Sequence, residues 1–200
     1  MEQACLIKRC QLDDKQAFEE LYQRYCHQAL KTAYLISGDP EIAEDIVQET
    51  FIQCFKSIKQ LKEPDAFYAW FYKTLIRCGW RINAKYRQKK LKLSVIENEP
   101  MDAIDRNFNL EDIVETKEVY DLIQKALMKL TAPMRAAVTL YYYNDMTISE
   151  IAVVLDCFQG TVKSRLHNAK KILEKELERY FLTEDIPVSK TQRKESILNG

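Results

Sequence analysis

A chain of 200 residues with four glycines and five prolines is too poor in turn formers for a sandwich, a barrel or a glycine-rich phosphate loop, so we expect a mostly helical protein of one or two domains. Its 46% hydrophobic and 30% charged residues exclude a disordered or fibrous chain. Thirty basic and thirty acidic residues give a formal charge of +0, which excludes any argument from overall basicity and makes the distribution of charge informative.

The charges are segregated along the chain. Residues 1–96 carry 16 basic and 12 acidic residues, a net charge of +4, whereas residues 97–121 carry 2 and 9, a net charge of −7. Residues 122–182 return to a net charge of +3. This pattern predicts two mildly basic modules joined by an acidic connector.

The cysteines and histidines indicate no metal site and no cofactor. Six cysteines are scattered without a C-x-x-C pair, which favours free thiols in a reducing compartment. His27 and His167 occupy no metal-ligand spacing. No apolar run approaches the roughly 18 residues of a membrane span, and no basic region followed by an apolar one opens the chain. We therefore expect a cytoplasmic protein without membrane insertion.

The first long helix is predicted from Asp14 to about Ile36, and Gly38 ends it. Asp39 then caps a second helix, and Pro40 fits its first turn. The outer face of this second helix begins with several carboxylates. Its predicted buried face consists of Ile42, Ile46, Val47, Phe51, Phe55 and Ile58.

A third long helix is predicted from Ala66 to about Leu91, with a possible kink at Gly79. Between Ala66 and Ile96 the chain holds eight basic residues and no acidic one, interleaved with seven aromatic residues. One interpretation is a helix with an aromatic core face and a solvated basic face. The other is a nucleic-acid surface, because cations neutralise phosphates and aromatic rings stack on unpaired bases.

Residues 94–112 lack a helical stripe and have the composition of a linker. Helical periodicity resumes at Ile113, and a further helix is predicted to start at residues 131–133 and to end near Asp145. Thr147 and Glu150 fit a capping box, which places the start of a short helix there.

The stretch after this capping box is the most informative part of the chain. Residues 148–155 supply one apolar face, residues 156–160 form a tight turn, and residues 162–173 supply the face of a following helix. This layout is typical of a helix-turn-helix whose second helix enters a major groove, although spacing alone also allows a plain helical hairpin.

These segments resemble the extracytoplasmic-function group of bacterial RNA polymerase sigma factors. Residues 150–152 and 160–166 are similar to that family's promoter-binding helix-turn-helix, residues 39–51 to its polymerase-docking helix, and residues 66–90 lie where its promoter-melting helix belongs. The chain departs from the family pattern at Ile76, Arg77 and Arg81 of the melting helix, and at the turn residues Cys157, Phe158 and Gln159.

The resemblance implies an all-α fold of two small helical domains joined by an acidic linker, with the helix-turn-helix in the C-terminal domain. Residues 1–95 would dock on the polymerase and melt and recognise the −10 element, residues 96–112 would be the linker, residues 113–182 would read the −35 duplex, and residues 183–200 would be a polar tail. The linker would thread through the polymerase cleft, while composition alone also allows a solvated tether.

Each surface then receives candidate residues. For the −35 duplex these are Thr161, Lys163, Ser164, Arg165, His167 and Lys171. For the −10 DNA they are Lys73, Arg77, Arg81, Lys85 and Arg87, with Trp70 and Tyr72 as aromatic supports, Trp70 by packing more than by base contact. For polymerase docking they are Asp45, Gln48 and Glu49, where the alternative is ordinary helix surface.

The expected partners are core RNA polymerase, through its β′ clamp helices and β flap, promoter DNA, and an anti-sigma factor. The chain itself would be a transcription initiation factor with no small-molecule substrate and no catalytic residues, since no nucleophile–base pair is visible. The main alternative is a helix-turn-helix regulator that binds duplex DNA without polymerase. A scaffold bundle is the second alternative.

Overall fold

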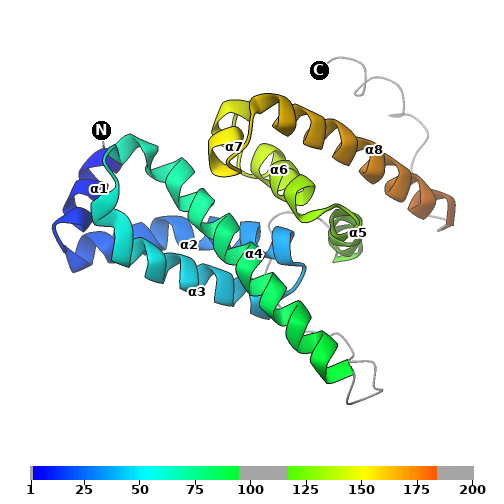
Figure 1. The fold of residues 1–200 in the computed structure, drawn as a ribbon, viewed down its shortest axis with the longest axis horizontal. Helices are drawn as coiled ribbons and strands as arrows, with labels where there is room; N and C mark the ends of the chain where they lie inside the picture. Colours follow the sequence, from blue (N-terminus) through cyan, green and yellow to red (C-terminus); the bar gives the residue numbers. More distant parts are fainter. Residues whose placement is uncertain (1, 95–116, 184–200) are drawn as a thin grey trace.

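The computed structural model describes residues 2–94 and 117–183, and within these ranges all regular structure is helical (Figure 1). The N-terminal half contains α1 (Glu2–Gln11), α2 (Lys15–Ser37), α3 (Pro40–Ser57), the short 3₁₀ helices η1 (Ile58–Gln60) and η2 (Pro64–Ala66), and α4 (Phe67–Ser94). The C-terminal half contains α5 (Lys117–Met128), α6 (Ala132–Tyr142), α7 (Ile148–Val154) and α8 (Gln159–Thr183). The predicted all-helical fold is confirmed.

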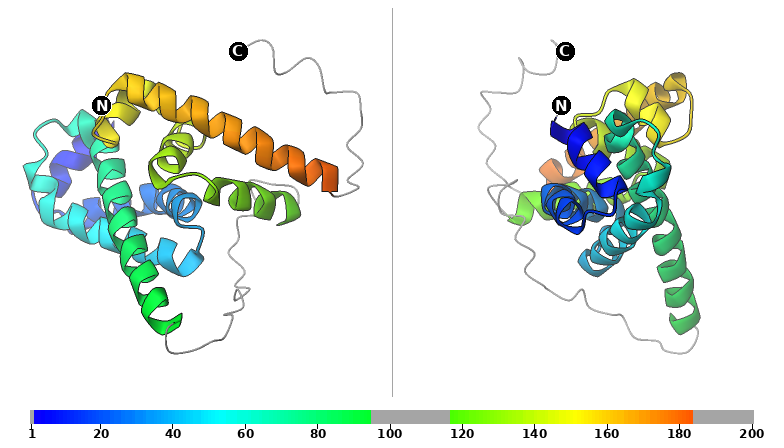
Figure 2. Two further views of the ribbon diagram at one scale, coloured as in Figure 1. Left: turned by 45° about the vertical axis from the view of Figure 1, so that its right-hand side comes forward. Right: turned by 90° about the vertical axis from the view of Figure 1, so that its left-hand side faces the viewer.

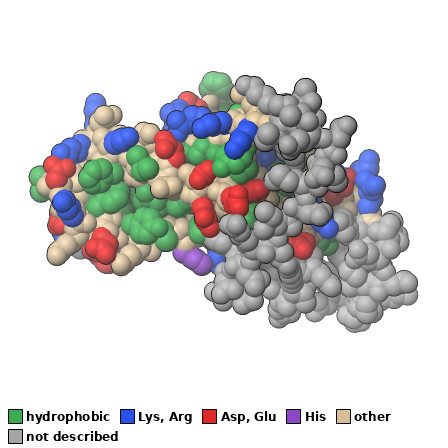
Figure 3. All heavy atoms as spheres, turned by 90° about the horizontal axis from the view of Figure 1, so that it is seen from below, with side chains coloured by type: hydrophobic (Ala, Val, Ile, Leu, Met, Phe, Trp, Pro, Cys, Tyr) green, Lys and Arg blue, Asp and Glu red, His purple; other side chains and the backbone are tan. Residues whose placement is uncertain are grey.

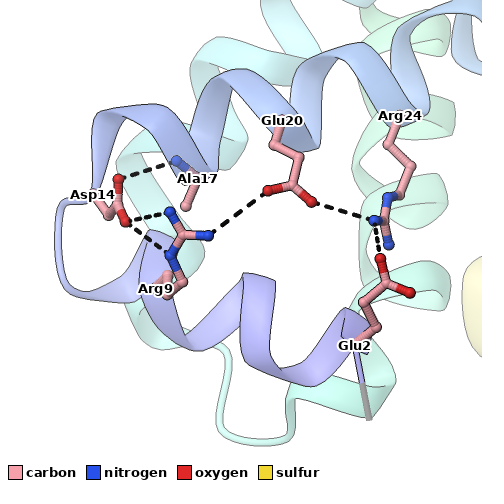
Figure 4. A network of polar contacts seen from close by, with 6 residues as sticks. All are labelled: Glu2, Arg9, Asp14, Ala17, Glu20 and Arg24. Atoms are coloured by element: carbon pink, nitrogen blue, oxygen red, sulfur yellow. Dashed lines mark hydrogen bonds and ion pairs between the residues drawn. The ribbon is translucent and has the colours of Figure 1, made fainter.

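Helix α1 was not predicted, although Leu6, Ile7 and Cys10 are buried at helical spacing. A polar network ties it to α2 (Figure 4). The Arg9 guanidinium binds Asp14 at 2.7 Å, and the Asp14 carboxylate also accepts a hydrogen bond from the backbone N–H of Ala17 at 3.1 Å, which caps α2. These two contacts lower the pKa of Asp14. The network thus fixes the turn between the first two helices.

The sharp connection between α2 and α3 follows its predicted chemistry. Gly38 ends α2 in the left-handed conformation, with φ 79°, which favours glycine. Asp39 caps α3 by accepting the backbone N–H of Ile42 at 3.0 Å. The chain therefore reverses within two residues, and α2 and α3 pack side by side.

The core of the N-terminal half is aromatic, and α4 supplies much of it. Phe67, Phe71 and Tyr72 are completely buried, and the ring of Phe71 lies 5.3 Å from that of Phe51 on α3. Helix α4 runs through Gly79 as one helix. A Cβ atom at Gly79 would lie 2.8 Å from Cδ1 of Ile36, so the glycine permits the close approach of α2.

The predicted burial of α3 is correct at most positions. Ile46, Val47, Phe51 and Ile58 are buried and Ile42 is partly buried. The prediction for Phe55 is wrong, because its side chain is 56% exposed. The predicted linker at residues 96–112 and the tail after Thr183 lie outside the described residues.

The two halves pack against each other and share one continuous core cluster (Figure 2). Helix α7 lies against α4, and α6 and α5 lie against α2. At the contact, the buried side chain of Asn144 donates a hydrogen bond to Oγ1 of Thr32 at 3.0 Å. The hydroxyl of Tyr68 donates to the backbone carbonyl of Asn144 at 3.0 Å, and the amide of Gln124 donates to the carbonyl of Tyr34 at 3.0 Å. This arrangement is called the closed arrangement below.

Candidate nucleic-acid and polymerase interfaces

Four of the five basic residues predicted to contact −10 DNA follow one another at four-residue steps and form a stripe along α4; these are Lys73, Arg77, Arg81 and Lys85. Arg87 follows Lys85 by only two residues, so it lies outside this stripe. Arg77, Arg81, Lys85 and Arg87 are exposed, and Lys73 is half-buried. Tyr72 is completely buried, which raises the pKa of its hydroxyl, and Trp70 packs partly buried against the core. Both aromatic residues therefore support the helix from within.

Three cations of this α4 stripe are already engaged by carboxylates of the chain. The carboxylate of Asp156, in the turn before α8, lies 3.4 Å from Lys73 Nζ and 3.3 Å from Arg77 Nη2. The carboxylate of Glu49 on α3 lies 2.7 Å from Arg81 Nη2. Three of the cations predicted to contact −10 DNA are thus neutralised within the chain.

The three residues predicted to bind polymerase lie close together on α3, at positions i, i+3 and i+4. Asp45 accepts a hydrogen bond from the hydroxyl of Tyr86 on α4 at 2.6 Å, which raises the pKa of Tyr86 to about 12. Hydrogen bonds from Gln53 and Arg81 lower the pKa of Glu49. Gln48 instead faces a groove between α2 and α3. Asp45 and Glu49 thus also contact α4.

The groove beside Gln48 encloses about 710 Å³ and was not predicted. Its walls include the exposed apolar side chains of Tyr22, Ile52 and Phe55. Hydrophobic side chains gather on this side of the molecule over α2 and α3 (Figure 3). One signal in the sequence could have indicated this groove. The apolar side chains of the second helix extend around more of its surface than one buried face requires.

The C-terminal half contains the predicted helix-turn-helix. The capping box is complete, because the Glu150 carboxylate accepts the backbone N–H of Thr147 at 2.8 Å and Oγ1 of Thr147 accepts the N–H of Glu150 at 3.3 Å. The Thr147 hydroxyl also donates to the Glu150 carboxylate at 2.7 Å, and this bond, together with the one from the Thr147 N–H, lowers the pKa of Glu150. Asp156 turns the chain in the left-handed conformation, with φ 53°, and buried Val162 seats α8 on α7.

Four of the six residues predicted to read the −35 duplex form an exposed stripe on α8. These are Lys163, Ser164, His167 and Lys171. Lys163 and Lys171 take part in no ion pair with the described residues. Thr161 and Arg165 are half-buried at the edge of the stripe, and the Arg165 guanidinium lies 3.4 Å from the sulfur of Cys157 in the turn. All six residues therefore lie in the N-terminal half of α8.

A second, more apolar groove of about 390 Å³ lies between the two halves. Helices α2, α5, α6 and α8 line it, with Leu35, Ile123, Val138 and Leu173 among the apolar side chains. It crosses the contact between the halves, so an occupant would touch both of them.

Within residues 2–94 and 117–183, no group of three metal-ligating side chains comes together. In the same ranges, no helix is long and apolar enough to cross a membrane. All six cysteines are free.

Comparison with protein families gives two matches. Residues 21–78 match the family described as Sigma-70 region 2, and residues 120–173 match Sigma-70, region 4. The first range runs from within α2 through α3 into α4, and the second runs from within α5 into α8 and includes the helix-turn-helix. Together the two matches span more than half of the chain.

Similar proteins carry related names. The chain is 28% identical over 180 residues to the ECF RNA polymerase sigma-E factors of Salmonella typhimurium and Escherichia coli, covering 86% of this chain and 93% of each relative. It is 27% identical to the RNA polymerase sigma-H factor of Pseudomonas aeruginosa, covering 86% of this chain and 92% of that protein.

Two solved structures share the fold. The structure of CnrH in complex with the cytosolic domain of CnrY matches with a TM-score of 0.66 and 19% identity, covering 90% of this chain and 99% of CnrH. The sigma factor RpoE of Bartonella quintana, in complex with the anti-sigma factor NepR, matches with a TM-score of 0.64 and 22% identity. The match covers 80% of this chain and 96% of that sigma factor.

Proposed function

We propose that this chain, which belongs to the extracytoplasmic-function group of the sigma-70 family of RNA polymerase sigma factors, uses α8 to read duplex promoter DNA and α4 to hold melted DNA. The chain is a transcription initiation factor that directs RNA polymerase to promoters, not a stand-alone regulator and not an enzyme. The observation that carries the proposal is the pair of separate basic surfaces. The α8 residues lie within the region 4 match, whereas the α4 residues begin within the region 2 match, at Lys73 and Arg77, and continue past its end at Cys78.

On α8, the exposed stripe fits the major groove of the −35 element. Lys163 and Arg165 can donate to phosphates or guanine edges, while Ser164 and His167 are positioned for base or backbone contacts. Buried Val162 holds the helix in place and does not contact DNA.

On α4, the basic stripe fits the phosphates of opened −10 DNA. Lys85 and Arg87 are exposed, whereas Lys73, Arg77 and Arg81 must exchange a carboxylate of the chain for a phosphate. Exposed ion pairs contribute only about 0–1 kcal/mol each, so this exchange costs little.

Polymerase docking is assigned to α3 and the groove beside it. Asp45, Gln48 and Glu49 supply polar contacts that steer a basic partner. Phe55 and Ile52 supply apolar area next to them. An apolar centre with a polar rim is the usual anatomy of a protein interface.

The closed arrangement must open on a promoter. In it the turn before α8 lies within 3.4 Å of the α4 stripe. The −35 and −10 elements, as their names imply, are about 25 base pairs apart, which is on the order of 80 Å along a duplex. One closed molecule cannot occupy both elements, so the halves separate when polymerase binds.

An anti-sigma factor is the proposed ligand of the closed arrangement. The 390 Å³ groove touches both halves, so an apolar helix bound there would stabilise their contact. The similar structures of CnrH and of the Bartonella sigma factor were both solved as complexes, the second with an anti-sigma factor by name. We assign this chain to the cytoplasm, where its polymerase partner works.

The proposal is tested by sequencing the 5′ ends of transcripts made in vitro by core polymerase with and without this protein. We expect new start sites that share two DNA elements at fixed spacing. The rival regulator predicts DNA binding by the chain alone and unchanged start sites, and that result would overturn the proposal.

A further inference from the structure

The turn that precedes α8 carries an exposed phenylalanine that no role above explains. Phe158 is 88% exposed, more than any other large hydrophobic side chain in the part of the chain that the structure describes. Burying a phenylalanine ring is worth about 1.5–3 kcal/mol, so leaving it in water forgoes that stabilisation. The ring is therefore available for an apolar contact outside the chain.

The backbone of Phe158 fixes where the ring stands. Its carbonyl accepts the N–H groups of Thr161 at 2.9 Å and Val162 at 3.2 Å, so the residue directly precedes α8 and its carbonyl accepts the first hydrogen bonds of that helix. In a helix-turn-helix the N-terminal residues of the second helix are those that reach base edges. Phe158 thus stands at the position from which bases are read.

Gly160 gives a second, independent indication at the same turn. It precedes Ser164 by four residues and His167 by seven, so it lies on the exposed stripe of α8. A Cβ atom there would meet no atom within 4 Å, and its backbone has no positive φ. Neither packing nor conformation within the chain requires glycine, although glycine weakens a helix. A surface that approaches α8 closely from outside would require it.

The surroundings indicate which kind of surface approaches. Lys163 is exposed next to this turn, and the Arg165 guanidinium lies beside Cys157. An apolar ring flanked by cations fits duplex DNA better than an apolar protein partner, because the cations meet phosphates. In the major groove the apolar group within reach is the 5-methyl group of thymine, which phenylalanine contacts in known readout.

Resting on the proposed function of α8, we propose that Phe158 reads a thymine of the −35 element by packing on its 5-methyl group, and that Gly160 permits the close approach. Specificity for one base pair then comes from an apolar contact, in addition to the polar contacts of Lys163 and Ser164.

The test uses the holoenzyme and its own selected promoter. Each thymine of the −35 element is replaced in turn by deoxyuridine, which lacks only the methyl group, and binding is measured. We expect an approximately fourfold loss at one position, the fold-change that corresponds to burying one methyl group. Phe158→Ala should bind both DNAs equally, at the reduced level. Leu12→Ala, which removes another strongly exposed side chain on a different surface, should retain the methyl dependence.

A second variant separates DNA contact from folding. Gly160→Ala should leave the melting temperature of the chain unchanged or raise it, because alanine favours a helix, and should weaken promoter binding at least fourfold. Equal affinity of the wild type for thymine and deoxyuridine at every position would overturn the inference, as would a −35 element without thymine. Weaker binding of Phe158→Ala to core polymerase would also overturn it. Failure to select any promoter would instead overturn the proposed function.

Discussion

On α4 the cations nearest the C-terminal half are paired with carboxylates of the chain, whereas on α8 Lys163 and Lys171 extend into solvent. The difference follows from position. Helix α4 runs between α3 and the turn at Asp156, each of which presents an acid, while the exposed stripe of α8 faces away from the other half. Under the proposed function, the α8 stripe can meet duplex DNA as it stands, whereas Lys73, Arg77 and Arg81 on α4 become available only when DNA displaces the chain's own acids.

The largest effect, on promoter affinity, is expected from charge reversal on the exposed surface of α8. Lys163→Glu combined with Arg165→Glu should lower affinity of the holoenzyme for its promoter by about 100-fold or more, because good base contacts are worth about 1–3 kcal/mol each and repulsion is added. The control is Lys8→Glu with Lys129→Glu, the same charge change at exposed sites away from both DNA surfaces. Unchanged promoter binding by the first double variant would show that α8 does not read DNA.

The second prediction concerns the buried hydrogen bond between the two halves, and it replaces the hydroxyl group of Thr32 by a methyl group. Thr32→Val leaves the amide of Asn144 without its partner and should lower the free energy of unfolding by about 1–3 kcal/mol, measured by urea titration. The matched control is Thr139→Val, since the buried hydroxyl of Thr139 has no hydrogen-bond partner among the residues that the structure describes. That variant should be neutral or slightly more stable. Equal losses in both variants would contradict a specific role for the Thr32 hydrogen bond.

A smaller effect, on DNA affinity, is expected when the basic side chains of α4 lose a carboxylate partner. Asp156→Asn removes the carboxylate that holds Lys73 and Arg77 but keeps a residue that tolerates positive φ. Affinity of the free chain for single-stranded DNA should rise by at most about fivefold, since exposed ion pairs contribute about 0–1 kcal/mol. Asp145→Asn is the control, because Asp145 has φ 52° and makes no ion pair within the described residues. A rise in both variants would indicate only a general charge effect.

The smallest effect concerns Glu49. Its pKa is lowered in the folded chain, so its carboxylate contributes stability above the ordinary glutamate pKa of about 4.3 and loses it as the pH falls below that value. The wild type should therefore exceed Glu49→Gln in free energy of unfolding by more at pH 7 than at pH 3.5. The difference should stay under about 1 kcal/mol. Glu44→Gln, which removes the same charge at an exposed site on the same helix, is the control in the same thermal unfolding series.

The helices were largely predictable because their signals are local. Asp39, Gly38 and the pair Thr147 and Glu150 mark helix ends through bonds to backbone groups within four residues, and each of them works as predicted. Helix α1 was missed although its three buried residues have helical spacing, because a helix of ten residues offers few repeats.

The interfaces were only partly predictable because they depend on distant residues. The exposed stripe of α8 follows from its own periodicity. The bond between Thr32 and Asn144 joins positions 112 residues apart, and no local pattern announces it. Phe55 fits the apolar stripe of α3 by spacing, yet no further helix covers it in the described structure, so it remains exposed beside the groove.

Under the proposed function, both DNA surfaces can be used at once only after the two halves separate, and a distance measurement tests this separation most directly. Spin labels at Gln16 on α2 and Lys175 on α8, both exposed, would report the separation once the three more accessible cysteines, Cys5, Cys26 and Cys157, are replaced by serine. In the free chain we expect one narrow distance, set by the closed arrangement. With core polymerase on promoter DNA the distance should increase by tens of ångströms, on the scale of the roughly 80 Å between the two DNA elements. The same distance in both states, with the promoter bound, would contradict the proposed opening.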